Sequence, residues 1–306
     1  MADSFMSEEP RDHHYVPQFF LRNFAVDPEQ QKVTTVAKNR QYAVWAKRSI
    51  ERLGYERDLY VHLRHGVPVS VETGINRRIE TPIAKSDAWA KIMSNRTECL
   101  DRSDKPILYA LIRHLEVRTP HYLETARELA HLSALPDGGI TFAPEEREMY
   151  AVMRAYPNEA KRFFNLMSST LEWTEQAFRG ACLSILRSPI PLRSSTTPVL
   201  AVSTPFHPAL RLPLPGMVPY QLILTLNRTT IASLVLADFD DAFANEEISA
   251  EVAKSFNRHF AAQFAHFEYV RHLITGRDDL ASDMTWAHYD LIEEGARKIT
   301  FRRRIP

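Results

Sequence analysis

Segments with a strand-like pattern are confined to two parts of this 306-residue chain, and long stretches of helical pattern separate them. Residues 32–36, 41–46 and 58–63 make the first group, and residues 220–226 and 231–237 make the second. Strands that cluster instead of alternating with helices are typical of an α+β fold and not of a doubly wound sheet. The sequence therefore predicts an α+β fold that is mainly helical, with a small N-terminal group of short strands and a C-terminal antiparallel hairpin.

Helical periodicity is strongest in the middle of the chain. After the capping residues at 103–104, apolar side chains recur at helical spacing as far as Leu115. Two further helices are expected over residues 144–155 and 158–187, and a last long helix over residues 246–273.

The pattern along the chain also predicts its division. We expect residues 1–12 to be a disordered N-terminus and residues 13–280 to be a single α+β domain. Residues 281–306 are expected to be a C-terminal extension with a basic end. Residues 189–219 are rich in proline, and we expect them to form a loop that faces a protein partner.

Composition excludes several classes of function. Lys plus Arg equals Asp plus Glu at 38 each, so no overall field draws the chain to nucleic acid or an anionic membrane. Cys99 and Cys182 are too few and too far apart for a disulfide framework or a cysteine-based zinc site. No signal peptide and no membrane-spanning run is found, so a cytoplasmic protein without membrane contact is expected. Glycine-rich motifs for a nucleotide cofactor are also missing.

The run HHYVPQFFLRNF over residues 13–24 is the most distinctive motif. A proline is favoured in the first turn of a helix, so Pro17 is expected to begin a short helix anchored by the apolar residues that follow. The free N–H groups of that turn, with His13, His14 and Arg22, would suit an anion. Alternatively, His14 only hydrogen-bonds a carbonyl group and orients the chain.

The order His14-x-Val16-Pro17-x-x-x-Leu21-x-x-Phe24 resembles the start of a largely bacterial family of uncharacterised proteins, domain of unknown function 4238. Residues 57–60 (Arg-Asp-Leu-Tyr), 79–80 (Ile-Glu) and 118–120 (Arg-Thr-Pro) are also similar to the family pattern. A later Ser-Asp-x-Pro-Val element of the family has Thr196 here in place of its aspartate. The resemblance covers about residues 11–275 and implies a related fold, but the family has no agreed activity.

Carboxylates and basic groups near these motifs are the candidate site residues. Asp58 and Glu80 lie on separate expected elements, and with His14 they offer donors that suit Mg²⁺ or Mn²⁺. Alternatively, each carboxylate pairs with one of the arginines. His114 and Arg118 lie one turn apart on a helix and would suit phosphate, although a solvated helix face is the simpler interpretation.

These residues lead to the hypothesis of a metal-dependent phosphodiesterase, a nuclease-like effector acting on nucleic acid or another phosphate-bearing substrate. His14 would be the general base or a metal ligand, and Arg118 would neutralise the phosphate. Asp58 and Glu80 would be catalytic as the ligands of the ion. The substrate would contact His13, Arg22 and His114.

The neutral net charge means that nucleic acid would have to be bound through a local basic cleft. By analogy with other uncharacterised bacterial families of this size, a role in phage defence or as a toxin is expected. The alternative is a non-catalytic protein-binding module in which the motif of residues 13–24 is structural and residues 189–219 face the partner.

Overall fold

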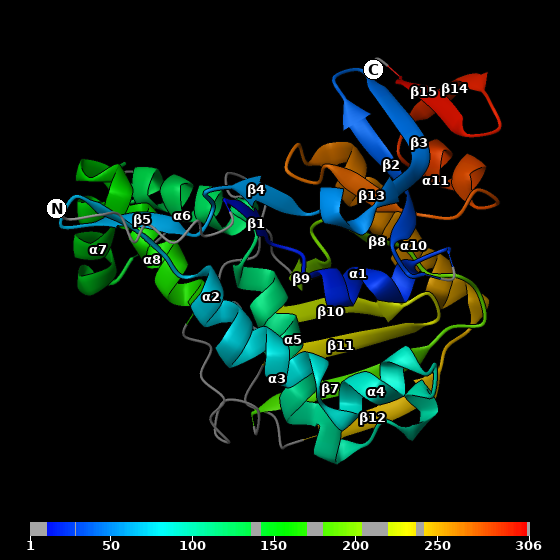
Figure 1. Cartoon of the computed structure of the whole chain (residues 1–306), viewed down its shortest axis with the longest axis horizontal. Coiled ribbons are helices and arrows are strands. Elements are labelled where there is room, and N and C mark those ends of the chain that lie inside the picture. The colour runs from blue at the N-terminus through cyan, green and yellow to red at the C-terminus, as the bar shows by residue number, and fades with distance from the viewer. Residues whose placement is uncertain are drawn as a thin grey trace, which may run out of the picture.

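The computed structural model describes residues 11–27, 29–135, 142–169, 180–203, 220–236 and 242–304. Two sheets organise the molecule, one of five strands and one of six (Figure 1). A separate group of helices projects at one side of the molecule, and both sheets lie at the opposite side (Figure 1).

The five-stranded sheet has the order β12-β7-β11-β10-β9, and only the β12–β7 pair is parallel. Successive side chains of its strands point to opposite faces. Leu222 and Leu224 therefore join one apolar cluster, whereas Ile223 joins the other. The strands are β7 (Ala181–Arg187), β9 (Val199–Ser203), β10 (Tyr220–Asn227), β11 (Thr230–Leu236) and β12 (Ala242–Glu247).

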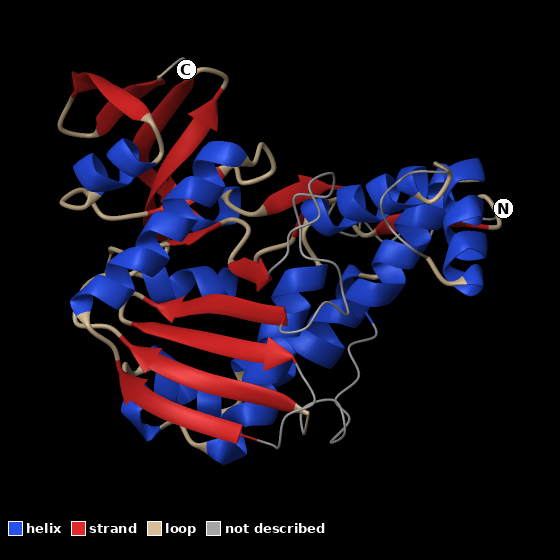
Figure 2. Ribbon diagram, turned by 180° about the vertical axis from the view of Figure 1, so that it is seen from behind, coloured by secondary structure: helices blue, strands red, loops and turns tan. Residues whose placement is uncertain are grey.

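The six-stranded sheet has the order β14-β15-β3-β2-β13-β8. Its strands are β2 (Lys32–Asn39), β3 (Tyr42–Ser49), β8 (Ser194–Ser195), β13 (His272–Ile274), β14 (Tyr289–Glu294) and β15 (Lys298–Arg303). Helices α10 (Ala250–His266) and α11 (Leu280–Trp286) lie beside this sheet, and α10 runs from it past one end of the five-stranded sheet (Figure 2).

Four helices lie across one face of the five-stranded sheet, namely α1 (Gln18–Leu21), α3 (Thr81–Ala84), α4 (Asp87–Met93) and α5 (Lys105–Val117) (Figure 1). The projecting group contains α6 (Pro120–Leu132), α7 (Pro144–Ala155), α8 (Pro157–Ser169) and the hairpin of β5 (Val61–Arg64) and β6 (Val67–Ser70). Short 3-10 turns connect these elements: η1 (Arg22–Phe24), η2 (Ile50–Arg52), η4 (Thr97–Cys99) and η5 (Arg102–Asp104).

The expected α+β class is correct, but the expectation of a mainly helical chain is wrong. Helices make up 44% of the structure and strands 31%, in sheets of six and five strands. Part of the error lies in residues 158–187, for which one helix was expected. The helix α8 ends at Ser169, and Cys182 and Ile185 lie on β7. Short apolar runs of this kind fit either periodicity, and the sheet partners of β7 decide the outcome.

Segments from the N-terminal and C-terminal parts of the chain pair in the six-stranded sheet. β15 pairs with β3 over the register from Lys298↔Ala46 to Arg302↔Tyr42. β14 and β15 are therefore strands of this sheet, and residues 281–303 are not an appended tail. Arg304 pairs with Asp290, with 2.7 Å between Nε and Oδ1. Among the described helices, none combines the length and the apolar character that crossing a bilayer requires.

Candidate functional site

The motif segment is held in place by its own backbone. Strand β1 (Asp12–His14) pairs with β4 (Tyr55–Arg57), and the N–H groups of Tyr15 and Val16 both donate to the carbonyl of Gly54, at 2.7 and 3.0 Å. Gly54 has a φ of 61°, and a Cβ there would lie 2.6 Å from Cβ of Val16. Only glycine fits this turn, and the turn fixes the position of the backbone that carries His14.

Pro17 precedes α1, and α1 continues into η1, so the expected short helix is confirmed. Phe20, Leu21 and Phe24 are at most 1% exposed and join the larger apolar cluster. This burial fixes the helix against the five-stranded sheet and leaves Gln18 and Phe19 at the rim of a pocket.

A second helical segment approaches the motif from the other side. It runs through α2 (Glu72–Ile75), the π-helix η3 (Asn76–Glu80) and α3 without a break in the chain. Widened π turns inside α-helices are uncommon and frequently occur at functional sites. Here the π turn ends at Glu80, and it places Glu72, Asn76 and Glu80 in the lining of one pocket.

Arg118 joins these two segments to the C-terminal end of α5. Its guanidinium donates to the Glu80 carboxylate, to the main-chain carbonyl of His14, to the Tyr60 hydroxyl at 2.9 Å and to Nε2 of His114 at 2.9 Å. The Tyr60 hydroxyl in turn donates to the Arg118 carbonyl at 2.9 Å. We call these five residues the Arg118 cluster. Arg118 is 0% exposed, so every contact it makes is internal.

Charge in the Arg118 cluster is strongly localised. Burial alone would raise the pKa of Glu80, but the charge of Arg118 and the contact with His114 outweigh it and lower the pKa to about 2. Burial and the nearby Arg118 lower the pKa of His114 to about 4. At neutral pH the cluster therefore holds a carboxylate, a guanidinium and a neutral imidazole.

The imidazole of His14 lies at the edge of the cluster. Its Nε2 is 3.1 Å from the carbonyl oxygen of Glu51, which can only accept, so Nε2 carries the hydrogen. The Gln18 amide nitrogen lies 3.5 Å from the same nitrogen and forms no hydrogen bond with it, because both are donors in this tautomer. Burial, and then the charge of Arg118, lowers the pKa of His14. The ring is therefore neutral at neutral pH, with its lone pair on Nδ1.

A pocket of about 280 Å³ opens beside this ring, and we call it the His14 pocket. Its polar lining residues are His14, Gln18, Glu72, Asn76, Glu80 and Thr81. Two carboxylates and a neutral imidazole at one opening can accept protons and bind donors. The arrangement suits general base chemistry better than direct binding of an anion.

The structure brings together some of the expected site residues. His14, Glu80, Arg118 and His114 meet in the Arg118 cluster. Neither His114 nor Arg118 forms the solvated face that helical spacing favoured, since both are 0% exposed. Their burial also rules out contact with a substrate, because the motif, Tyr60 and Glu80 cover that side of α5.

Other expected site residues lie elsewhere. His13 is 1% exposed, and its Nδ1 accepts the N–H of Tyr60 at 2.9 Å, so it is a structural group. Asp58 forms an ion pair with Arg11, with 3.0 Å between Nε and Oδ1. Arg22 lines a different pocket of about 400 Å³, together with Arg228.

The residues expected to hold a metal ion do not fit one. Asp58 does not line the His14 pocket with Glu80 and is instead paired with Arg11. In the parts of the chain that the structure describes, no group of three or more His, Cys, Asp or Glu side chains has the arrangement of a metal site.

Sequence reasoning missed Glu72, Asn76 and Tyr60. Glu72, Asn76 and Glu80 are spaced by four residues, which is the signal for one helix face. Gly74 and Pro82, two residues that disfavour a helix, lie in the same stretch and weaken that signal. Tyr60 belongs to the Arg-Asp-Leu-Tyr stretch, but nothing in the sequence indicates that its hydroxyl donates to the Arg118 carbonyl at the end of α5.

Residues 192–200 of the proline-rich stretch are buried. Ser194, Ser195 and Thr196 are 0% exposed, and β8 pairs with β13. The Thr196 hydroxyl accepts the N–H of His272 at 3.2 Å, at the position where the resemblance implies an aspartate. These residues do not face a partner, and residues 204–219 lie outside the described residues.

Comparison with known families agrees with the resemblance in the motif. The model of the family described as Protein of unknown function (DUF4238) matches residues 12–272. The chain belongs to this family. The family match includes every residue of the Arg118 cluster. No curated protein and no solved structure is similar enough to count as a match.

Proposed function

We propose that this protein is a hydrolase whose general base is His14. The observation that carries the proposal is the setting of its ring, which borders an open pocket while Nε2 donates to the Glu51 carbonyl. A ring nitrogen bound in this way orients the imidazole and leaves the other nitrogen to take a proton. Water in the pocket would transfer a proton to Nδ1 as its oxygen attacks the substrate. The bond to the leaving group would then break, and the protonated imidazole would return the proton to that group.

Arg118 has a different part in this proposal from the one expected from the sequence. It is fully buried and cannot neutralise a phosphate on the substrate. Its bonds to the His14 carbonyl and the Glu80 carboxylate make it a positioning residue for both. The Glu80 carboxylate, with a side chain 15% exposed, is the member of that ion pair that reaches the pocket.

We propose a phosphodiester, as in nucleic acid, as the bond that is hydrolysed. Arg22 and Arg228 support this, since they line a common pocket, here called the arginine pocket, and form no salt bridge within the described residues. Gln18 of the His14 pocket and Arg22 are four residues apart, or ~6 Å along a helix. Phosphates that flank the scissile bond would contact these arginines, because the carboxylates of Glu72 and Glu80 disfavour a phosphate deep in the His14 pocket.

A non-catalytic binding module is the second candidate. The saturation of Arg118, Tyr60 and His13 by internal hydrogen bonds favours it, because such bonds lock the motif to α5 without any substrate. In this case the His14 ring holds η2 in place through its hydrogen bond to the Glu51 carbonyl. Removing the ring would then lower the stability of the protein and would abolish no activity.

The test compares the wild type with H14A and H259A. His259 is a matched control, because its ring also contacts a main-chain carbonyl, that of Ser255 at 2.7 Å, on the exposed face of α10. Each protein is incubated with labelled single- and double-stranded DNA and RNA, with Mg²⁺, with Mn²⁺ and with chelator. Thermal unfolding of each variant is followed in parallel.

Cleavage by the wild type and H259A, lost in H14A at an unchanged melting temperature, is the expected result. Cleavage that survives in chelator would further agree with a site that has no metal ligands in place. If no protein cleaves and H14A melts at a clearly lower temperature, the binding module is the better account. If the wild type cleaves nucleic acid, a role in phage defence or as a toxin is tested by expressing the wild type and H14A in bacteria and comparing phage plaque counts and bacterial growth.

A further inference from the structure

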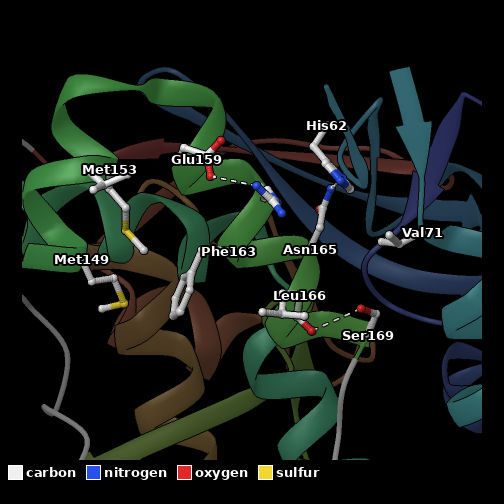
Figure 3. A pocket seen from close by; sticks show the side chains of 11 residues that line it. His62, Val71, Met149, Met153, Glu159, Phe163, Asn165, Leu166 and Ser169 are labelled. Carbon is white, nitrogen blue, oxygen red and sulfur yellow. Dashed lines mark hydrogen bonds and ion pairs between the residues drawn. The ribbon is translucent and has the colours of Figure 1, made fainter. Parts of the chain in front are cut away.

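A larger pocket, of about 460 Å³, lies in the projecting group of helices, away from His14 (Figure 3). We call it the apolar pocket. Its apolar lining consists of Val71, Met149, Val152, Met153, Phe163 and Leu166. Pockets of this size and character are typical of sites for small organic ligands.

The walls of the apolar pocket leave large apolar side chains uncovered. Val152 of α7 is 43% exposed and Leu166 of α8 is 55% exposed. Met149 and Met153 line the side opposite His62 and Val71 (Figure 3). Methionine side chains are flexible and polarizable, so this wall can adapt to a flat or branched apolar group.

One polar group in the lining lacks a partner. Asn165 is 1% exposed, and its Nδ2 lies 3.0 Å from Nδ1 of His62. Burial lowers the pKa of His62, so the ring is neutral and its Nδ1 accepts this bond. Oδ1 of Asn165 has no hydrogen-bond partner within the described residues. A buried acceptor without a donor is unfavourable, and a ligand that brings a donor relieves the cost.

We propose that the apolar pocket binds a small molecule with an aromatic or other apolar body and one N–H or O–H donor, directed at Oδ1 of Asn165. The apolar body would contact Met149, Met153 and Phe163. This inference goes beyond the proposed hydrolase and does not rest on it, because no residue of the apolar pocket lines the His14 pocket.

Indole is the probe, since it joins an apolar body to a single N–H donor. Its matched partner is 1-methylindole, which has the same ring system but carries a methyl group in place of the N–H hydrogen and so lacks the donor. Calorimetric titration of the full chain is expected to give saturable, one-to-one binding of indole, with 1-methylindole bound about tenfold more weakly. Equal affinity for the two probes would overturn the proposal, and so would tighter binding of benzofuran, which carries only an acceptor.

Two variants locate the site. M149W fills the pocket and is expected to abolish binding of indole, whereas N165L is expected to remove the preference for indole over 1-methylindole. M149W keeps the test valid even if N165L does not fold. Unchanged binding in M149W would overturn the proposed location. H14A is expected to bind indole like the wild type, so failure of the hydrolase proposal would leave this result intact.

Discussion

Two buried arginines occupy the two halves of the molecule, and they form similar ion pairs in different surroundings. Arg118 bonds to Glu80 and the His14 carbonyl. Arg193 donates from Nε to Asp283 at 2.8 Å and from its other nitrogens to Asp279 and the Pro191 carbonyl. Both arginines are at most 3% exposed. A buried arginine–carboxylate pair is therefore no sign of a functional site by itself.

The carboxylates show the difference. Asp283 is completely buried, and its pKa is raised because desolvation outweighs the charge of Arg193. Glu80 reaches the His14 pocket, and its pKa is lowered to about 2. The Arg193–Asp283 pair only joins α11 to the segment around Arg193. The Arg118–Glu80 pair holds a carboxylate, and the backbone of His14, at the edge of the His14 pocket.

The largest effect is expected for R193L. This substitution leaves Asp283 buried without its cation and should lower the free energy of unfolding by ~3–5 kcal/mol. Urea denaturation measures the change. Any activity of the folded fraction should be unaffected. A loss below about 1 kcal/mol would contradict the view that this pair stabilises the fold.

R118L should destabilise the protein by about 3 kcal/mol, at the lower end of the range for buried pairs, because Glu80 can reach solvent through the pocket. Unlike R193L, it should also abolish hydrolysis by the folded protein, since the His14 backbone loses its donor. R118K should recover little, because a lysine cannot bridge these acceptors. Folding measured by urea, together with cleavage assays on the folded fraction, separates the two effects. Full activity in R118L would remove Arg118 from the site.

Acid should destabilise the Arg118 half of the molecule. The pKa of His114 is about 4 when folded and about 6.5 when unfolded. The unfolded state therefore binds the proton first, and the stability is complete above pH 6.5 and is lost as the pH falls to about 4. The loss from this residue is ~1 kcal/mol per pH unit. Urea denaturation from pH 7.5 to 4.5 gives the free energy of unfolding at each pH, and this energy should fall less steeply with falling pH in H114Q than in the wild type. A pKa of His114 near 6.5 in the folded protein, measured by NMR, would contradict the prediction.

Asp283 should act with the opposite sign. Its folded pKa is raised, so its contribution is present below the unfolded pKa and is lost as the pH rises through the folded value. D283N should therefore cost most stability in acid and least at neutral pH. The measurement is the same series of urea curves, compared with H114Q.

The smallest effect on stability is expected for R22A. Arg22 is half-buried at the arginine pocket and pairs with no carboxylate within the described residues, so the change should stay within about 0.5 kcal/mol. If nucleic acid is the substrate, the slope of log K against log salt should fall by about 1. Fluorescence anisotropy over a salt series measures it. An unchanged slope would exclude Arg22 from the phosphate contacts.

Local patterns predicted several elements correctly. Pro17 immediately precedes α1, and the two apolar runs around Asn227 form the antiparallel pair β10–β11. Alternation and proline geometry act over a few residues, so their outcome depends little on the rest of the chain. The family resemblance also drew attention to Glu80 and Arg118, which the structure joins across 38 residues.

Helical spacing failed where burial depends on distant segments. His114 and Arg118 form a polar stripe on α5, and polar stripes usually face water. Here the motif and Tyr60 cover that stripe, and the hydrogen bonds of Arg118 satisfy its charge. Asp58 was expected to bind a metal ion with Glu80. Its carboxylate instead forms an ion pair with Arg11, which lies just before the motif.

The α+β class, the family and the short segments whose geometry a proline or an alternating pattern dictates all follow from local sequence. That residues 181–187 are a strand, that β15 joins β3 and which groups reach a pocket become known only from the folded chain. Those outcomes depend on contacts between residues far apart in the chain, and local periodicity carries no information about which distant surface covers a given face.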